Sequence, residues 1–285
     1  MTTFRVEFTD ARGLLAAAAA FLAAEPVASS VLNTVASRLV DVPPPAGRPQ
    51  WFALVREGDS VVGAAMRTAP FAPYPLYVVA MPDGAARALA VALRERGEDV
   101  PAVNGVVPAA RVVAEELAQG RPLRDERQHF YELTAPIAPR PASGALRAAT
   151  VDDLELAYAW FNAFHAAALA QSGRDEPFWS ETFSRDDVRQ RVEAGNVFFW
   201  VDGTPKQMTV QTPPSFGVSR IQLVYTPEAN RGHGYASAAV HAVACALLAD
   251  GVRVCLSADE GNATSNKIYE AIGFRRLFDT ANHVL

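Results

Sequence analysis

The segment with the most chemical content is a glycine-rich loop that opens a helix. It reads Arg231-Gly-His-Gly-Tyr-Ala236 and follows an apolar strand pattern over residues 219–225. The helix expected over residues 235–250 carries apolar residues at the spacing i, i+3, i+4, i+7, i+8, which indicates a buried stripe. Unpaired N–H groups and the positive dipole end make a helix N-terminus a phosphate site. The two glycines let the backbone approach a ligand closely, and the arginine adds a fixed positive charge.

The order of residues around this loop restricts the phosphate ligand. No Gly-Lys-Ser/Thr follows the loop, which excludes a P-loop. A dinucleotide fingerprint requires a third glycine where Ser237 stands and an acid at the end of the next strand, whereas the strand pattern over residues 252–257 ends without one. The hypothesis of a nicotinamide-dependent oxidoreductase is therefore supported by Gly232 and Gly234 alone. It stays open as an alternative, as does a loop whose glycines only form a turn.

A second segment of interest begins roughly 30 residues later. It reads Asn262-Ala-Thr-Ser-Asn-Lys-Ile-Tyr-Glu-Ala-Ile-Gly-Phe274, after a strand pattern over residues 252–257 and with a helix expected over residues 265–272. Together the two segments resemble the GNAT superfamily of acyl-CoA-dependent N-acyltransferases. The signature R/Q-x-x-G-x-G/A is matched by Arg231, Gly234 and Ala236. The second signature, N-x(6)-Y-x(3)-G-F, is matched by Asn262, Tyr269, Gly273 and Phe274.

The resemblance implies a cofactor and the residues that hold it. In this family the strand before the loop parts from its neighbour, and its backbone hydrogen-bonds the pantetheine arm like an added strand. The implied cofactor is acetyl-CoA, with CoA as the product. The implied cofactor-binding residues are Val224, Tyr225, Thr226, Arg231, Gly232, His233, Gly234, Tyr235, Ala236, Ser237, Asn262 and Ser265.

Tyr269 is the catalytic residue that the resemblance implies. It would stand near the thioester sulfur and protonate the departing thiolate. A thiol has a pKa near 8.5 and a tyrosine near 10 in model peptides, so the transfer is chemically reasonable. The alternative is a tyrosine that only packs on the buried side of an amphipathic helix. No metal site is expected, because the histidines and cysteines do not cluster at ligand spacing.

The general base departs from the family pattern. Many members carry a glutamate on the strand before the loop, and the corresponding region here offers Gln222, which cannot act as a base. Asp259 and Glu260 follow the next strand and are alternatives, although solvated loop acids are the simpler interpretation. His165 lies in an Ala-rich helical stretch and is interpreted as a packed or rim residue.

The chain also shows an internal repeat. Residues 51–55 and 197–201 are apolar strands, each followed by a tight turn at residues 57–59 and 202–203, so the offset is roughly 145 residues. Between the halves lies a stretch over residues 134–144 with three prolines, a composition typical of a linker. A tandem duplication of one α/β fold explains these observations.

The predicted architecture follows from the repeat and the resemblance. We expect two tandem GNAT-like mixed α/β domains, each a twisted, mostly antiparallel sheet flanked by helices. Residues 1–138 form the degenerate domain, because neither signature occurs there, and residues 144–285 form the catalytic N-acetyltransferase domain. The degenerate domain is expected to pack on the catalytic one and to wall the acceptor cleft.

The composition of the chain limits the kinds of partner and the location that we expect for it. The chain of 285 residues has a formal net charge of −5 and no basic stripe, so we expect no nucleic-acid partner. The apolar run over residues 14–24 is too short to cross a bilayer, and the start of the chain lacks the pattern of a secretory signal. Two cysteines, Cys245 and Cys255, make no disulfide framework. A cytoplasmic protein without membrane contact is therefore expected.

The function expected from the sequence is transfer of an acetyl or other short acyl group from CoA to a primary amine. The amine would attack directly within a ternary complex, and the acceptor would be a small-molecule amine or a peptide. The alternative is a catalytically weak acyl-CoA-binding regulatory or interaction protein. A homodimer is an open alternative for the assembly.

Overall fold

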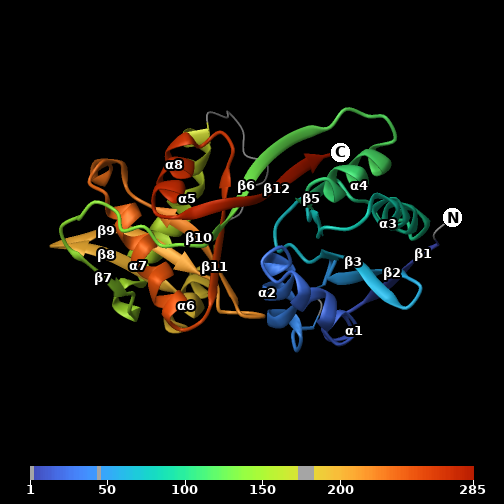
Figure 1. The fold of residues 1–285 in the computed structure, drawn as a ribbon, viewed down its shortest axis with the longest axis horizontal. Helices are drawn as coiled ribbons and strands as arrows, with labels where there is room; N and C mark the ends of the chain where they lie inside the picture. Colours follow the sequence, from blue (N-terminus) through green and yellow to red (C-terminus); the bar gives the residue numbers. More distant parts are fainter. Residues whose placement is uncertain (1–2, 44–45, 173–182) are drawn as a thin grey trace. The chain divides into compact units, whose positions relative to one another are not determined.

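A computed structural model describes residues 3–43, 46–172 and 183–285. Within them the chain forms two compact units. The first contains the residues up to Gln128 together with Phe278–Leu285, and the second contains His129–Leu277. Both are mixed α/β structures built around a mostly antiparallel sheet (Figure 1).

Within the described residues, the first half of the chain contains ten elements in the order β-α-α-β-β-β-α-β-α-β. They are β1 (Phe4–Thr9), α1 (Ala11–Ala24), α2 (Ser30–Leu39), β2 (Trp51–Glu57), β3 (Ser60–Arg67), β4 (Leu76–Val78), α3 (Asp83–Glu95), β5 (Ala102–Val106), α4 (Ala109–Ala118) and β6 (Arg124–Leu133).

The second half repeats this order, which supports the duplication. Its elements are β7 (Ala145–Ala148), α5 (Leu154–Ser172), α6 (Arg185–Glu193), β8 (Val197–Asp202), β9 (Thr204–Gln211), β10 (Val218–Tyr225), α7 (Tyr235–Ala249), β11 (Arg253–Asp259), α8 (Ala263–Ala271) and β12 (Phe274–Val284). Two short 3₁₀ helices are added, η1 (Val151–Asp153) and η2 (Glu228–Asn230). The helices expected over residues 235–250 and 265–272 are confirmed, the second beginning two residues earlier.

The strand pairing is also repeated. In the second unit the order is β6-β11-β10-β9-β8-β7, and in the first it is β1-β2-β3-β4-β5-β12. Neighbours within β1–β4 and within β7–β10 are antiparallel, whereas β4–β5 and β10–β11 are parallel. The expectation of a mostly antiparallel sheet with flanking helices is confirmed.

The two halves exchange their last strands. β6 closes the first series of elements, yet its residues from His129 onward belong to the second unit, where β6 lies beside β11. β12 closes the second series, yet its residues Thr280–Val284 pair antiparallel with β5 in the first unit. Each compact unit therefore needs a strand from the other half of the chain.

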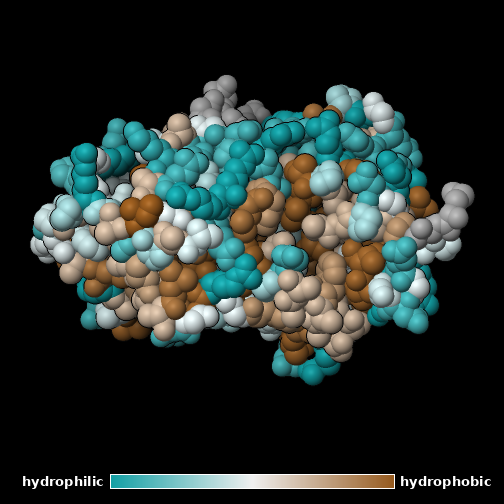
Figure 2. Space-filling view, in the orientation of Figure 1, coloured by the Kyte–Doolittle hydropathy of each residue, from teal (hydrophilic) through white to brown (hydrophobic). Residues whose placement is uncertain are grey.

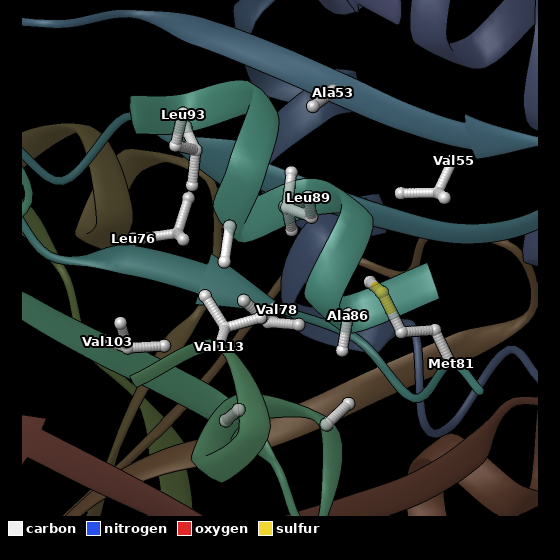
Figure 3. Packing of buried hydrophobic residues seen from close by; sticks show 14 of the residues in the cluster. Ala53, Val55, Leu76, Val78, Met81, Ala86, Leu89, Leu93, Val103 and Val113 are labelled. Atoms are coloured by element: carbon white, nitrogen blue, oxygen red, sulfur yellow. The ribbon is translucent and has the colours of Figure 1, made fainter. Parts of the chain in front are cut away.

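The core of the first unit lies between the sheet and the helices α3 and α4 (Figure 3). Ala86, Leu89 and Leu93 of α3 pack on Leu76 and Val78 of β4, and all five side chains are buried.

On the outer side of α1 alanines are exposed, which appear as tan spheres in Figure 2. In the described part of the chain, no helix is both long and apolar enough for a membrane span.

The core of the second unit has one layer on each face of its sheet. Val240, Val243 and Leu247 of α7 pack on Val254 and Leu256 of β11, which confirms the buried stripe expected on that helix. On the other face, α5 and α6 pack on β8 and β9. This packing fixes the N-terminus of α7 at the end of β10, where the expected phosphate loop lies.

Candidate active site

The strand β10 separates from β11 before it ends. The two strands pair in parallel only from Val218 to Ile221, although β10 continues to Tyr225 and β11 to Asp259. β10 has a bulge where the two strands separate. Ile221 pairs with Gln211 and Val224 pairs with Thr209, so three positions along β10 correspond to two along β9. An inserted residue bends a strand and increases its twist. The backbone of Val224, Tyr225 and Thr226 therefore has an edge that β11 does not use.

The equivalent strands of the first unit stay together. β4 pairs with β5 to its last residue, with Val78 opposite Gly105. Gly105 has a φ of +152°, and a Cβ there would lie 2.0 Å from the carbonyl oxygen of Val78. The two backbones are thus in direct contact, and an extended ligand has no edge to join at this place.

The loop after β10 depends on its two glycines for its conformation. Gly232 and Gly234 both have a φ of +81°, which favours glycine. The Nε of Arg231 donates to the carbonyl oxygen of Thr226 at 3.1 Å, and Nδ1 of His233 lies 2.8 Å from the carbonyl oxygen of Arg231. Residues 231–234 are all exposed, so the loop is open to a ligand from solvent.

The N-terminus of α7 lacks a cap from the protein. Its first helical hydrogen bond runs from the N–H of Ala238 to the carbonyl of Gly234, so the amides of Tyr235, Ala236 and Ser237 precede that ladder. No side chain of the described residues caps this end, and its first turn holds no acid. Free amides, a positive dipole end and the adjacent loop are the features by which a helix N-terminus attracts an anion.

The corresponding helix of the first unit is closed to such a ligand. α3 follows Pro82 and has an acid, Asp83, in its first turn. The Phe4 ring lies over that turn, because a Cβ on Gly84 would be only 2.6 Å from it. Met81, just before the helix, is buried in the core (Figure 3). The first unit thus retains the strand order but presents neither the loop nor the open helix end.

A polar network that the sequence did not reveal anchors α7. The hydroxyl of Tyr235 donates to Oδ2 of Asp202 at 2.8 Å, and the hydroxyl of Ser143 donates to the same oxygen at 2.6 Å. These hydrogen bonds, Ser143 first, lower the pKa of Asp202. The indole of Trp200 donates to the carbonyl of Ser143 at 2.7 Å, and the His233 ring stacks on Tyr235 with centroids 5.5 Å apart. Asp202 only indicated a hairpin turn and Ser143 a linker, so their sequence signal was local.

Asn262 is the N-cap of α8. Its Oδ1 accepts from the N–H of Ser265 at 3.0 Å, and its Nδ2 donates to Oε1 of Gln171 on α5 at 3.2 Å. The side chain is largely buried, whereas Ser265 is partly exposed. A contact from Asn262 to pantetheine stays a prediction, and the observed role of its carbonyl is to start the helix that carries Tyr269.

Tyr269 lies in an apolar environment between α8 and the sheet. Its side chain is 7% exposed, and its ring centroid lies 6.0 Å from that of Phe274 and 6.4 Å from that of Tyr131. Burial raises the pKa of Tyr269, and a hydrogen bond with the Ser265 hydroxyl opposes this shift only in part. The phenol is therefore protonated at neutral pH and can act as a proton donor.

A steric requirement explains the glycine of the second signature, Gly273. Gly273 has a φ of +105°, and a Cβ there would lie 2.0 Å from the carbonyl oxygen of Ala135. Gly273→Ala is expected to destabilise the chain by about 2–5 kcal/mol, from the left-handed conformation and the backbone clash together. Urea unfolding followed by circular dichroism measures this loss. Gly251→Ala is the matched control, because Gly251 has a φ of +75° but nothing within 4 Å of a Cβ. Equal losses in the two variants would contradict the steric explanation.

The residues considered for a general base have other partners. Gln222 accepts from Nη1 of Arg191 at 3.2 Å, and Oδ1 of Asp259 accepts from the N–H of Gly261 at 2.8 Å. Glu260 lies 4.0 Å from Nε2 of His129. His165 stacks on Phe183, and burial lowers its pKa. Within the described residues, no cluster of three or more His, Cys, Asp or Glu could hold a metal ion.

The aromatic residues near the expected acceptor region pack on one another. Trp160 makes edge contacts with Phe199 and with Tyr225, and Phe161 makes one with Phe183. These contacts support core packing for Trp160 and Phe161. Phe178 and Trp179, two further aromatic residues of this part of the sequence, lie outside the described residues.

Comparisons with known proteins agree with this geometry. Residues 212–283, which contain both signatures, match the family model described as FR47-like protein. Among solved structures, a GCN5-related N-acetyltransferase from Sphaerobacter thermophilus aligns with a TM-score of 0.64 and 16% identity, over 98% of this chain and 94% of that one. The chain has the GNAT fold. No curated protein matches the sequence.

Two further structures also align over nearly the whole chain. A GNAT-family acetyltransferase from Colwellia psychrerythraea has a TM-score of 0.58 and 12% identity, over 99% of both chains. A tandem GNAT protein from the clavulanic acid biosynthesis pathway has a TM-score of 0.57 and 12% identity, over 99% of this chain and 98% of that one. The resemblance seen in the two signatures is therefore confirmed, and it holds at the level of the fold.

Proposed function

We propose that the chain is an N-acyltransferase that moves an acetyl or other short acyl group from CoA to a primary amine. One observation carries the proposal: β10 bulges and parts from β11 immediately before the uncapped N-terminus of α7. An unused strand edge next to free helix amides suits a ligand with an amide-bearing arm and a diphosphate. Coenzyme A has this combination, and a nicotinamide dinucleotide has no such arm.

The binding roles follow from the contacts above. The amides of Gly232 to Ser237 and the Arg231 side chain would hold the diphosphate. The backbone of Val224 to Thr226 would pair with the pantetheine arm, and Asn262 and Ser265 would border it from α8. The Asp202 network would keep the first turn of α7 in place, because Tyr235 is tied to it from within that turn.

The proposed chemistry needs one proton donor. The acceptor amine attacks the thioester carbonyl, the carbon–sulfur bond breaks, and the sulfur takes the proton of the Tyr269 hydroxyl. The raised pKa of Tyr269 keeps that proton in place until the thiolate forms. The amine loses its own proton to water, since Gln222 stands where a carboxylate base would be expected, and a solvent proton then restores the Tyr269 hydroxyl. A glutamine at this place favours an acceptor with an amine pKa near neutrality, such as an α-amine near 7.7–8.0.

The first unit is proposed to bind no CoA. Gly105 is in contact with the Val78 backbone, and Phe4 lies over the first turn of α3, so both halves of the ligand site are closed. We therefore propose that residues 1–138 form a degenerate domain and residues 144–285 the catalytic domain, as expected from the sequence. We also propose the cytoplasmic location expected from the sequence. The first half of the chain contributes to the second unit the residues of β6 from His129 onward.

The second candidate function is an acyl-CoA-binding protein without turnover. Gln222 favours it, because it removes the base that many members of the superfamily carry. The buried, protonated Tyr269 favours an enzyme instead, since binding alone requires no proton donor at that place.

Thiol release from acetyl-CoA tests the proposal. The purified chain is mixed with acetyl-CoA and a panel of polyamines, amino acids, amino sugars and peptides with free N-termini, and free thiol is measured. An acyltransferase releases thiol with at least one amine, whereas a binding protein is stabilised by CoA against heat without release. Thermal stabilisation by NAD and not by CoA would contradict both candidates.

A further inference from the structure

Tyr131 lies beside the proposed proton donor but comes from the other half of the chain. It belongs to β6, the last strand of the first series of elements. Its side chain is fully buried, at 0% exposure, in the same apolar cluster as Tyr269. The two ring centroids are 6.4 Å apart, with planes inclined by 59°.

The hydroxyl of Tyr131 binds the helix that carries Tyr269. It donates to Oδ1 of Asn266 at 2.9 Å, and Oε1 of Glu270 lies 3.5 Å from it. Asn266 in turn donates through Nδ2 to the carbonyl oxygen of Asp259 at 2.8 Å. Tyr131 thus ties α8 to β6 and, through Asn266, to the end of β11.

The helix α8 is short, and it packs on the core through Tyr269 and the half-buried Ile268. It has nine residues, and Tyr269 is its one buried residue. Helices shorter than about 12–15 residues are marginal by themselves, so packing and polar contacts must set their position. The N-cap Asn262 fixes the start of α8, and the bonds from Tyr131 act within the turn that holds Tyr269.

We propose that Tyr131 is a positioning residue that sets the orientation of α8 and presents the Tyr269 hydroxyl to the acyl donor. The inference rests on the proposed function and adds a residue to it. It also gives the first half of the chain a defined role, because the residue that orients the proton donor is supplied by β6. The proximity of the Tyr131 phenol adds to burial in raising the pKa of Tyr269.

A cycle of four proteins tests this proposal: wild type, Tyr131→Phe, Tyr269→Phe and the double variant. Phenylalanine keeps the buried ring and removes only the hydroxyl. With the amine that the wild type uses fastest, Tyr131→Phe should lower kcat about 10- to 100-fold, as misplacement of a catalytic group does. The calorimetric Kd for CoA should stay within about twofold, since none of the bonds lost touches the phosphate loop.

The decisive comparison is made in the Tyr269→Phe background. If Tyr131 acts through Tyr269, adding Tyr131→Phe to Tyr269→Phe should lower kcat less than about twofold. A structural brace alone would lower kcat by the same factor in both backgrounds, and this result would overturn the proposal. Tyr77→Phe, which removes a tyrosine hydroxyl from β4 of the first unit, is the control for an unspecific loss.

A measurement without turnover separates this proposal from the proposed function. The Cζ resonance of Tyr269 is assigned in ¹³C-tyrosine-labelled protein by its absence in Tyr269→Phe. It should shift in Tyr131→Phe and stay unchanged in Tyr77→Phe. An unchanged resonance in Tyr131→Phe would overturn the positioning role. A shifted resonance in a chain that binds CoA but releases no thiol would support the positioning and contradict the transferase function.

Discussion

Tyr269→Phe is expected to lower thiol release about 10²–10⁴-fold, the range typical of the loss of a placed proton donor. Affinity for CoA should stay within about threefold, because the diphosphate and the pantetheine arm are held by other residues. The fold should tolerate the change, since the ring keeps its contacts with Phe274 and Tyr131 and only a hydroxyl is removed. Steady-state kinetics and calorimetry on the same preparations separate the two effects.

The pH dependence sharpens this first prediction. Burial raises the pKa of Tyr269 above its ordinary value near 10, so the proton donor is fully present at all pH values below that. Turnover of the wild type should therefore show no loss from Tyr269 ionisation up to about pH 10. A Tyr269→Phe protein that turns over as fast as the wild type would show that the phenol only packs in the core.

Ser237→Asp is expected to weaken CoA binding by about 10- to 100-fold. The residue is the third of α7, so the new carboxylate would take the place and the amides proposed for the diphosphate. The loss corresponds to about 1.5–3 kcal/mol, the usual value of a hydrogen bond to a charged group. Stability of the free protein should change in the opposite direction, because an acid in the first turn stabilises a helix by about 0.3–1 kcal/mol.

Ser237→Asn is the matched control for this second prediction. It has the shape of aspartate without the charge, so the difference between the two variants isolates electrostatic repulsion. Calorimetry with CoA at low and high salt should show that the difference shrinks as salt rises. Equal affinities of the Asp and Asn variants would place the diphosphate away from the α7 amides.

Local patterns predicted the helices and the glycine-rich loop of the second unit. The apolar spacing along α7 and the asparagine that begins α8 are set by neighbours within a few positions. The same holds for the repeated order of elements, since each strand and helix carries its own periodicity. Both signatures lie in such segments, which is why the proposed cofactor residues could be named from the sequence.

Long-range partners were not predictable in this way. In the sequence, Tyr131 is part of an ordinary strand pattern. Nothing near it indicates a hydrogen bond to Asn266, which is 135 positions away. The exchange of β6 and β12 depends on pairing energies across the whole fold, because each strand pairs with strands from the other half of the chain. The bulge in β10 depends on register with β9, which alternation within a single strand does not reveal.

The measurement closest to the central claim is calorimetric titration of the wild-type chain with CoA. The account predicts saturable binding with one site per chain, because the second unit has an open strand edge and free helix amides and the first has neither. It also predicts competition by 3′-phospho-ADP, which carries the diphosphate without the pantetheine arm. A folded protein that gives no binding signal, or two equivalent sites per chain, would contradict the account.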